Sequence, residues 1–237
     1  EVINLSKSYK TKKAVNNISF KIDENEIVGL LGPNGCGKTT TIGMILGLLK
    51  PTSGQVLING KNIENNKISI LHKMNFISPY IELPKKLTVK QNLIVYGKLY
   101  NIKNLNERIN FLSEKLRLGD LLDKITGELS SGQKNRVSLA KALINDPTVL
   151  LLDEPTAALD PETADFIRTF LEKLREEKKI SVLLASHNMD EVKRLCNSVM
   201  MMKDGNIVDG GTPEDLIEKY GQKNLEEVFL EIVRKDK

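Results

Sequence analysis

Apolar residues fall along the chain in patterns that predict its strands and helices. Nearly continuous apolar runs at residues 27–31, 149–152 and 180–185 are typical of strands buried on both faces. Between the last two runs, residues 161–179 carry apolar side chains at the spacing i, i+3, i+4, i+7, which predicts an amphipathic helix. Buried strands alternating with helices predict an α/β fold around a mostly parallel sheet.

Further regions are predicted outside this core. Alternating apolar and polar residues within 1–28, with a short apolar run at 56–58, predict a small antiparallel β subdomain. Apolar residues at helical spacing predict a helical insert at approximately 85–145 and a C-terminal helix at approximately 212–235. We therefore expect residues 1–237 to form a single domain in which the helical insert interrupts the α/β core.

The composition limits the classes of function. Of the 237 residues, 40% are hydrophobic and 28% are charged, which is ordinary for a globular protein. The net charge of +4 comes with no basic stripe, so we expect no nucleic-acid partner. No apolar run has the length of a membrane span, and no signal-peptide pattern opens the sequence. The sequence begins at Glu1 instead of Met, so we expect a few native residues to precede it.

The segment after the first buried run, Gly32–Thr39, matches the Walker A pattern G-x-x-x-x-G-K-[ST]. A predicted strand precedes it and a predicted helix follows, which makes a chance match in a glycine-rich turn the weaker interpretation. Glycines let backbone N–H groups point at an anion, and a helix N-terminus adds positive potential. We expect Lys38 to hold the β- and γ-phosphates of ATP and Thr39 to ligate Mg²⁺. The predicted ATP-binding residues here are Gly32, Pro33, Asn34, Gly35, Cys36, Gly37, Lys38, Thr39 and Thr40.

Polar side chains also follow the two later buried runs. Asp153 and Glu154 lie at the carboxyl end of a predicted strand, which is where α/β folds bind ligands. Asp153 fits the Mg²⁺ ligand of P-loop enzymes, and Glu154 is placed to orient or deprotonate an attacking water. In isolation the two acids could merely cap a helix, but the Walker A pattern upstream makes that the minor interpretation. A lone His after a strand is more often structural than catalytic, but the position of His187 at the next strand end strengthens the functional interpretation.

Two residues have both a structural and a functional interpretation. Tyr9 could be a half-exposed tyrosine at a strand edge or an aromatic platform for an adenine ring. Cys36 could fill space in the loop, or it could be reactive because a helix N-terminus lowers a thiol pKa. In the second case, alkylation would inhibit ATP hydrolysis and bound ATP would protect. With Cys196 as the other cysteine, the chain has no disulfide framework, as expected in a reducing cytosol.

The order of these motifs resembles that of an ATP-binding cassette (ABC). Leu129–Gln133 lies between the Walker A segment and the Asp153–Glu154 pair, and it resembles the LSGGQ signature of the family. Ala158–Asp160 resembles the D-loop, and His187 resembles the switch histidine. The resemblance covers nearly the whole chain and is to the nucleotide-binding subunit of an ABC transporter, which implies an ABC-type P-loop NTPase fold.

This resemblance implies a head-to-tail dimer that holds two ATP molecules between its subunits. Asp160 would lie at the dimer interface, while Tyr9 would stack on adenine. Glu154, His187 and Lys38 would be the catalytic residues, with ATP and Mg²⁺ as the bound groups. The residues that would reach the partner's ATP are Ser130, Ser131, Gly132 and Gln133.

The sequence departs from the family pattern at two points. Ser131 replaces the first glycine of the signature, where a Cβ would be costly if φ were positive. The family also places a Gln about where Pro79 stands, and that Gln would touch Mg²⁺ and the lytic water. Our hypothesis for this loop is that water or Glu82 takes its place at the metal.

The implied function is ATP hydrolysis that powers transport, with export favoured because residues 47–54 and 225–230 resemble short exporter-type cassettes. A separate transmembrane permease subunit would do the spanning. The ATPase subunits would form a homo- or heterodimer, peripheral on the cytoplasmic face of the membrane. The alternative is a soluble ABC ATPase, such as an iron–sulfur assembly ATPase. A regulatory module with little turnover is less favoured, since the expected catalytic and metal-binding residues are all present: Lys38, Asp153, Glu154 and His187.

Overall fold

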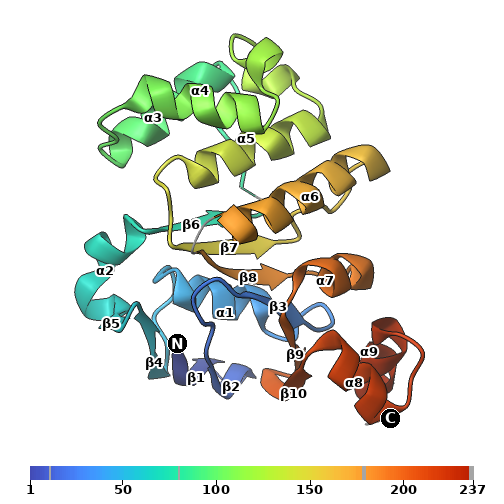
Figure 1. The fold of residues 1–237 in the computed structure, drawn as a ribbon. Helices are drawn as coiled ribbons and strands as arrows, with labels where there is room; N and C mark the ends of the chain where they lie inside the picture. Colours follow the sequence, from blue (N-terminus) through green and yellow to red (C-terminus); the bar gives the residue numbers. More distant parts are fainter. Residues whose placement is uncertain (11, 80, 178–179, 235–237) are drawn as a thin grey trace.

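The computed structural model describes residues 1–10, 12–79, 81–177 and 180–234. Its strands form a four-stranded sheet, in the order β2-β1-β4-β5, and a six-stranded sheet, in the order β10-β9-β3-β8-β7-β6 (Figure 1). In chain order the strands are β1 Val2–Tyr9, β2 Lys12–Phe20, β3 Ile27–Leu31, β4 Ser53–Ile58, β5 Lys61–Asn62, β6 Met74–Ile77, β7 Val149–Asp153, β8 Ser181–Ala185, β9 Ser198–Lys203 and β10 Asn206–Gly211.

The larger sheet is mostly parallel and the smaller one is antiparallel, so the predicted α/β fold class is confirmed. Among the described strands of the larger sheet, only β10 runs antiparallel to its neighbour, β9. The helices are α1 Lys38–Ile45, α2 Ile63–Leu71, α3 Val89–Leu99, α4 Leu105–Lys115, α5 Ser131–Leu143, α6 Pro161–Glu177, α7 Met189–Leu195, α8 Pro213–Tyr220 and α9 Leu225–Arg234, with short 3₁₀ turns η1 Gly119–Leu121 and η2 Thr126–Glu128.

Both faces of the six-stranded sheet are covered, which explains why its central strands are apolar throughout. Along β8, Val182 and Leu184 belong to one core cluster, which they share with the helices α3 to α9. Leu183 and Ala185 belong to the second cluster, shared with α1, α2 and the antiparallel sheet. The sheet is therefore the middle layer of the molecule, with helices α3–α5 grouped above it in Figure 1.

The strand register places the predicted functional segments along one edge of this sheet. Ala185 at the end of β8 pairs with Leu30 on one side and with Asp153 on the other. Leu152 in turn pairs with Ile77 at the end of β6. Because these strands are parallel, the segments that follow them emerge side by side. The first residues after the four strands are Gly32, Ser78, Glu154 and Ser186.

The helices that begin at Val89 and Ser131 each start with a capping box. Thr88 accepts from the N–H of Gln91, whose side chain accepts from the N–H of Thr88. Ser130 and Gln133 make the same reciprocal pair at the start of α5. These caps satisfy N–H groups that a helix end otherwise leaves without partners. Among the described residues, none of the helices has the length and apolar character needed to cross a membrane.

One helix prediction differs from the structure, and two extend past the described residues. The C-terminal segment 212–235 contains two helices, because Gly221 adopts a left-handed conformation with φ 62° and ends α8. The second helix, α9, is described to Arg234, and residue 235 lies outside the described residues. The helix predicted at 161–179 is described as far as Glu177, and residues 178–179 likewise lie outside.

Candidate functional site

A cavity of about 680 Å³ lies at the carboxyl ends of the parallel strands. That volume is within the range of ligand pockets in proteins. The cavity is lined by predicted functional residues from the segments after β3, β7 and β8, and by Tyr9 of β1. Its described lining residues are Tyr9, Lys12, Ala14, Gly32, Pro33, Asn34, Gly35, Gly37, Lys38, Thr39, Thr40, Pro79, Asp153, Glu154, Ala157, His187 and Phe229.

The loop between β3 and α1 is shaped by its glycines. Gly37, the N-cap of α1, has φ 116°, a conformation that L-side chains rarely adopt. A Cβ on Gly32 would lie 2.3 Å from the carbonyl oxygen of Met202, so a larger residue does not fit there. The loop thus packs tightly against β9 while the N-terminus of α1 faces the cavity, as a phosphate-binding loop requires.

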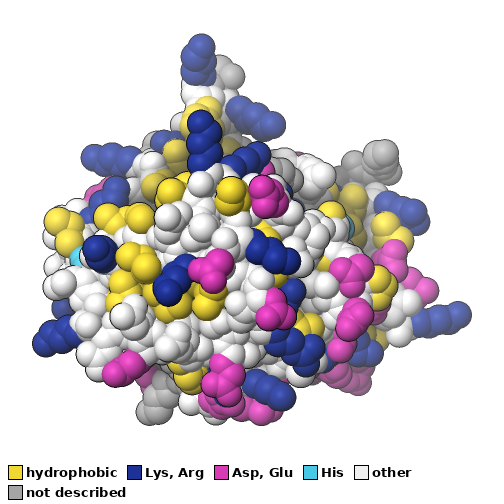
Figure 2. Space-filling view, turned by 90° about the horizontal axis from the view of Figure 1, so that it is seen from above, with side chains coloured by type: hydrophobic (Ala, Val, Ile, Leu, Met, Phe, Trp, Pro, Cys, Tyr) yellow, Lys and Arg dark blue, Asp and Glu magenta, His cyan; other side chains and the backbone are white. Residues whose placement is uncertain are grey.

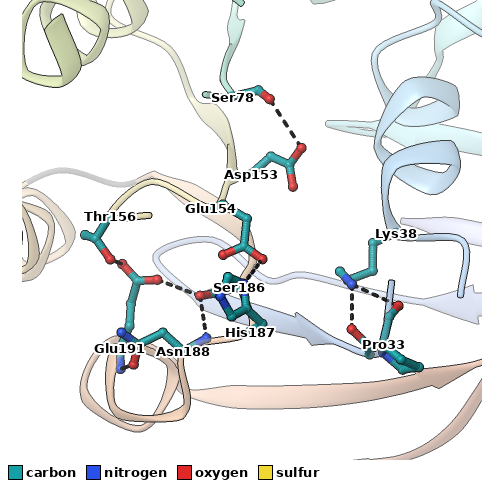
Figure 3. A network of polar contacts seen from close by, with 11 residues as sticks. Pro33, Lys38, Ser78, Asp153, Glu154, Thr156, Ser186, His187, Asn188 and Glu191 are labelled. Atoms are coloured by element: carbon teal, nitrogen blue, oxygen red, sulfur yellow. Dashed lines mark hydrogen bonds and ion pairs between the residues drawn. The ribbon is translucent and has the colours of Figure 1, made fainter. Parts of the chain in front are cut away.

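Lys38 bends its side chain back over this loop. Its ammonium donates to the carbonyl oxygens of Gly32 at 2.5 Å and Pro33 at 3.3 Å. Figure 3 shows the Lys38 side chain pointing toward Pro33. The side chain is 9% exposed but lines the cavity. A fixed positive charge beside the loop N–H groups suits a polyphosphate group.

Asp153 is a buried carboxylate at the end of β7, 5% exposed. The Ser78 hydroxyl donates to its Oδ2 at 3.4 Å. Burial raises the pKa of Asp153, and the neighbouring Glu154 charge adds to this effect. A divalent cation would offset both penalties. The oxygen donors of Asp153 and Thr39 line one cavity and match the hard ligands that Mg²⁺ prefers.

Glu154 and His187 face each other across adjacent strand ends. His187 Nδ1 lies 2.6 Å from Glu154 Oε1 (Figure 3). The backbone of Glu154 has φ 52°, and its N–H donates to the carbonyl oxygen of Ala185 at 2.8 Å. A non-glycine residue in the left-handed region is uncommon and carries strain that marks functional sites. The hydrogen bond to β8 holds this turn so that the carboxylate points at the imidazole.

Tyr9 lies at the rim of the cavity, with 47% of its surface exposed. The Lys7 ammonium lies 5.2 Å from the centre of its ring. It is thus both a strand-end tyrosine and part of the cavity wall, so its two interpretations are compatible. An exposed ring at a cavity rim is suited to stacking on a base.

The residues Ser130–Gln133 lie elsewhere. Ser130 is the N-cap of α5 and the next three residues begin the helix; none of them is among the described residues that line the cavity with Lys38. Ser131 is the first residue of α5, so its backbone is helical and φ is negative. The cost that a positive φ would have imposed on this serine therefore does not arise. A Cβ on Gly132 would meet the Thr163 side chain at 3.0 Å, which fits a glycine at that position.

Asp160 is exposed and is the residue before α6. Its Oδ1 accepts from the N–H of Thr163 at 2.9 Å, which is the geometry of a helix N-cap. This backbone hydrogen bond lowers the pKa of Asp160. The carboxylate therefore has a structural partner while its other face remains open to solvent.

In the loop after β6, the structure favours Ser78 over Glu82 at the metal position. Glu82 is exposed, and its carboxylate pairs with the Lys85 ammonium at 2.7 Å. Ser78 contributes the hydroxyl that faces Asp153. Sequence reasoning missed Ser78 because a serine after a strand carries no distinctive signal. Residue 80 of this loop lies outside the described residues.

We predict that Ser78→Ala raises the Mg²⁺ concentration needed for half-maximal ATPase activity by about three- to tenfold. The reason is the loss of a hydrogen bond worth about 1 kcal/mol to the ionised Asp153. Glu82→Ala is the matched control and should leave the Mg²⁺ requirement unchanged. A Mg²⁺ titration of ATPase rate measures both, and the reverse ranking of the two variants would restore the Glu82 hypothesis.

Cys36 is buried, which agrees with its interpretation as a space-filling residue. Burial raises the pKa of Cys36, and this outweighs the nearby Lys38 charge and backbone N–H groups. Its side chain is 3% exposed and packs in the core cluster below the loop. The interpretation as a space-filling residue therefore fits better than that of a reactive thiol.

We accordingly predict slow alkylation of Cys36 at pH 7. The raised pKa leaves little thiolate at neutral pH, so the labelling rate should increase as pH rises above the ordinary thiol range. Cys196 is also buried with a raised pKa and should behave alike. Maleimide labelling followed by mass spectrometry tests this, with the denatured chain as control. Rapid labelling of Cys36 in the folded protein at pH 7 would contradict the prediction.

Comparison with known proteins identifies the family. The family model described as "ABC transporter" matches residues 15–157. This chain belongs to the ABC transporter family. As an ABC protein it is the ATP-binding subunit of a transporter and an ATPase, so these predictions are confirmed. A second model, an AAA domain described as a putative AbiEii toxin, matches residues 125–192.

Curated ABC relatives include proteins for different transport tasks. The ABC transporter ATP-binding protein NatA of Bacillus subtilis is 34% identical over 93% of this chain and 91% of its own length. The bacitracin transport ATP-binding protein BcrA of Bacillus licheniformis is 36% identical over 94% of this chain and 72% of its own. The choline transport ATP-binding protein OpuBA of B. subtilis is 35% identical over 94% of this chain and 60% of its own.

Solved ABC structures have the same fold. An ATP-binding subunit of an ABC transporter superposes with TM-score 0.90 and 26% identity, covering 98% of each chain. A dimeric post-hydrolysis structure of the cassette MJ0796 bound to ADP and Pi superposes with TM-score 0.81 and 27% identity, covering 89% of this chain and 97% of that one. These likenesses confirm the predicted ABC-type fold.

Proposed function

We propose that this subunit hydrolyses ATP in a head-to-tail dimer and powers export through a separate membrane-spanning subunit. The observation that carries the proposal is the single cavity that contains the Walker A loop, Asp153, Glu154 and His187. Its basic and acidic parts have the complementary chemistry that a Mg²⁺-nucleotide needs. The relatives include both directions of transport: a Nod factor export ATP-binding protein of Burkholderia lata is 36% identical over 91% of this chain and 71% of its own length. The methionine import ATP-binding protein MetN of Latilactobacillus sakei is 38% identical over 88% of this chain and 62% of its own length, so the proposal of export rests on the exporter-type resemblance of residues 47–54 and 225–230.

The proposed mechanism assigns one task to each group. Backbone N–H groups of the loop and Lys38 bind the β- and γ-phosphates, while Thr39 and Asp153 hold Mg²⁺. The metal, when bound, neutralises charge on the phosphates. Water attacks the γ-phosphorus, Glu154 accepts its proton, and ADP leaves with the bridging oxygen. His187 steadies the Glu154 carboxylate through their 2.6 Å contact.

In the proposed dimer, Ser130–Gln133 face the partner's ATP and Asp160 lies at the interface. Support comes from their position outside the cavity of their own subunit and from the dimeric MJ0796 structures. Tyr9 is the proposed adenine platform. ATP would bridge surfaces that separate again once the γ-phosphate is hydrolysed and released.

The helical region is the proposed contact for the membrane subunit. Figure 2 looks onto the molecule from above, where apolar side chains lie among interspersed basic and acidic ones. Leu99 at the end of α3 is 68% exposed, with Val95 in the same helix 43% exposed. Large exposed apolar residues of this kind mark partner contacts when they gather on one face.

Affinity capture from the native cell membrane in mild detergent tests the proposal. We expect a polytopic membrane protein to copurify with the wild-type chain and to be lost from Leu99→Ser. Leu48→Ser is the matched control, since Leu48 is 69% exposed but lies after α1. Recovery of soluble partners alone would favour the soluble ABC ATPase instead. Retention of a labelled compound in cells lacking the subunit would establish export and reveal the substrate.

A further inference from the structure

A buried carboxylate lies directly behind the Glu154–His187 pair. Glu191 in α7 is 1% exposed. Its Oε1 accepts from the Thr156 hydroxyl and its Oε2 from the Ser186 hydroxyl, each at 2.7 Å. Figure 3 shows the carboxylate between these two hydroxyl groups. Burial of a charge is costly, so a carboxylate here indicates a specific task for its hydrogen bonds.

Both hydroxyl partners adjoin the catalytic pair. Thr156 follows Glu154 by two residues, and Ser186 immediately precedes His187. One carboxylate therefore ties the turn after β7 to the turn after β8. Those two turns must keep a fixed distance for the imidazole to remain 2.6 Å from the Glu154 carboxylate.

The start of α7 shows that this carboxylate is directed away from its own helix. The third residue of a helix commonly accepts from the N–H of the N-cap residue. Here the Ser186 hydroxyl accepts from the N–H of Asn188, the N-cap, at 3.1 Å. The serine thus stands between the helix end and the carboxylate of Glu191. The Asn188 side chain meanwhile accepts from the N–H of Glu191 at 3.1 Å, which caps α7.

Burial raises the pKa of Glu191, and the hydroxyl groups of Ser186 and Thr156 act in the opposite direction. The Arg168 charge also lowers the pKa. The hydroxyls are thus the direct partners that compensate for the lost solvation of the carboxylate. If either hydroxyl is removed, one oxygen of the buried Glu191 carboxylate loses the side-chain donor that the structure describes for it.

We propose that Glu191 is a positioning residue for ATP hydrolysis, one that fixes the two catalytic segments relative to each other through its hydroxyl partners. The inference rests on the proposed roles of Glu154 and His187. Glu191 is not among the described residues lining the nucleotide cavity. The hydrogen bonds described for its carboxylate go to Thr156 and Ser186, and to neither the phosphate-binding loop nor Tyr9. A kcat effect with little change in KM is therefore the signature of this role.

The test compares kcat and KM for Glu191→Ala, Glu191→Gln, Thr156→Val and Thr156→Ser, each normalised to the ATP sites titrated with a fluorescent ATP analogue. For Glu191→Ala we expect kcat to fall about 10- to 100-fold, with KM close to the wild-type value. Glu191→Gln should recover part of the loss because it keeps one acceptor oxygen. Thr156→Val should lower kcat, while Thr156→Ser, which keeps the hydroxyl, should not.

The controls separate this inference from the proposed function. Glu26→Gln should be neutral, since Glu26 also accepts from a serine hydroxyl, that of Ser198, but lies before β3, at the opposite edge of the sheet. Wild-type kcat per site in both Glu191→Gln and Thr156→Val, alongside an inactive Glu154→Gln, overturns the positioning role alone. If Glu154→Gln hydrolyses ATP at the wild-type rate, both the positioning role of Glu191 and the proposed role of Glu154 are overturned. If Glu191→Ala does not fold, the comparison of kcat between Thr156→Val and Thr156→Ser tests the positioning role of Glu191.

Discussion

Glu154→Gln is expected to lower ATP turnover about 10²- to 10⁴-fold while ATP still binds. The amide keeps the size of the carboxylate, but it cannot take the proton of the attacking water. The loop and Lys38 are unaffected, so phosphate binding should persist. Single-turnover hydrolysis of radiolabelled ATP, with equilibrium binding of the same nucleotide, measures the two properties separately.

The geometry around Glu154 makes this the most informative single substitution. The carboxylate lies 2.6 Å from His187 and is held by the N–H contact of its backbone to β8. Glu26→Gln is again the matched control and should keep full turnover. Near-normal hydrolysis by Glu154→Gln would mean that another group accepts the proton.

Lys38→Ala is expected to weaken ATP binding about 10- to 150-fold. This range corresponds to losing charge-assisted hydrogen bonds worth about 1.5–3 kcal/mol. Turnover at limiting ATP should fall at least as much. Isothermal titration with ATP and Mg²⁺, at constant ionic strength, gives the affinity directly.

Lys67→Ala is the control for this prediction. Lys67 also donates its ammonium to a backbone carbonyl, that of Gly47 at 2.7 Å, but lies in α2. It does not line the nucleotide cavity in the described part of the chain. Equal ATP affinity for Lys38→Ala and the wild type would remove Lys38 from the phosphate site.

The fold was predictable from the sequence where a single segment showed both a buried strand and the functional residues that follow it. The apolar run before Asp153 identified a buried strand, and its end fixed the place of the carboxylates. Parallel strands then brought Asp153, Glu154 and His187 to one edge without any further sequence signal. The Walker A loop was predicted for the same reason, since its glycines are required by backbone geometry.

Other features depend on contacts that no local pattern records. The raised pKa of Cys36 comes from burial beneath the loop, which overrides the effect of the helix N-terminus. The hydroxyl of Ser78 meets Asp153 only because β6 and β7 are neighbours. Glu191 looks in sequence like one more acid in the first turn of a helix, and its burial follows from how α7 packs.

The dimer is the central claim, and the mass of Glu154→Gln in solution tests it most directly. The account predicts the 26.6 kDa subunit with ADP and twice that mass with saturating ATP, by size-exclusion chromatography with light scattering. At an ATP concentration that saturates Glu154→Gln but lies below the weakened dissociation constant of Lys38→Ala, the Lys38→Ala variant should remain at the subunit mass. A Glu154→Gln chain that has ATP bound at every site, yet keeps the subunit mass, would contradict the ATP-bridged dimer.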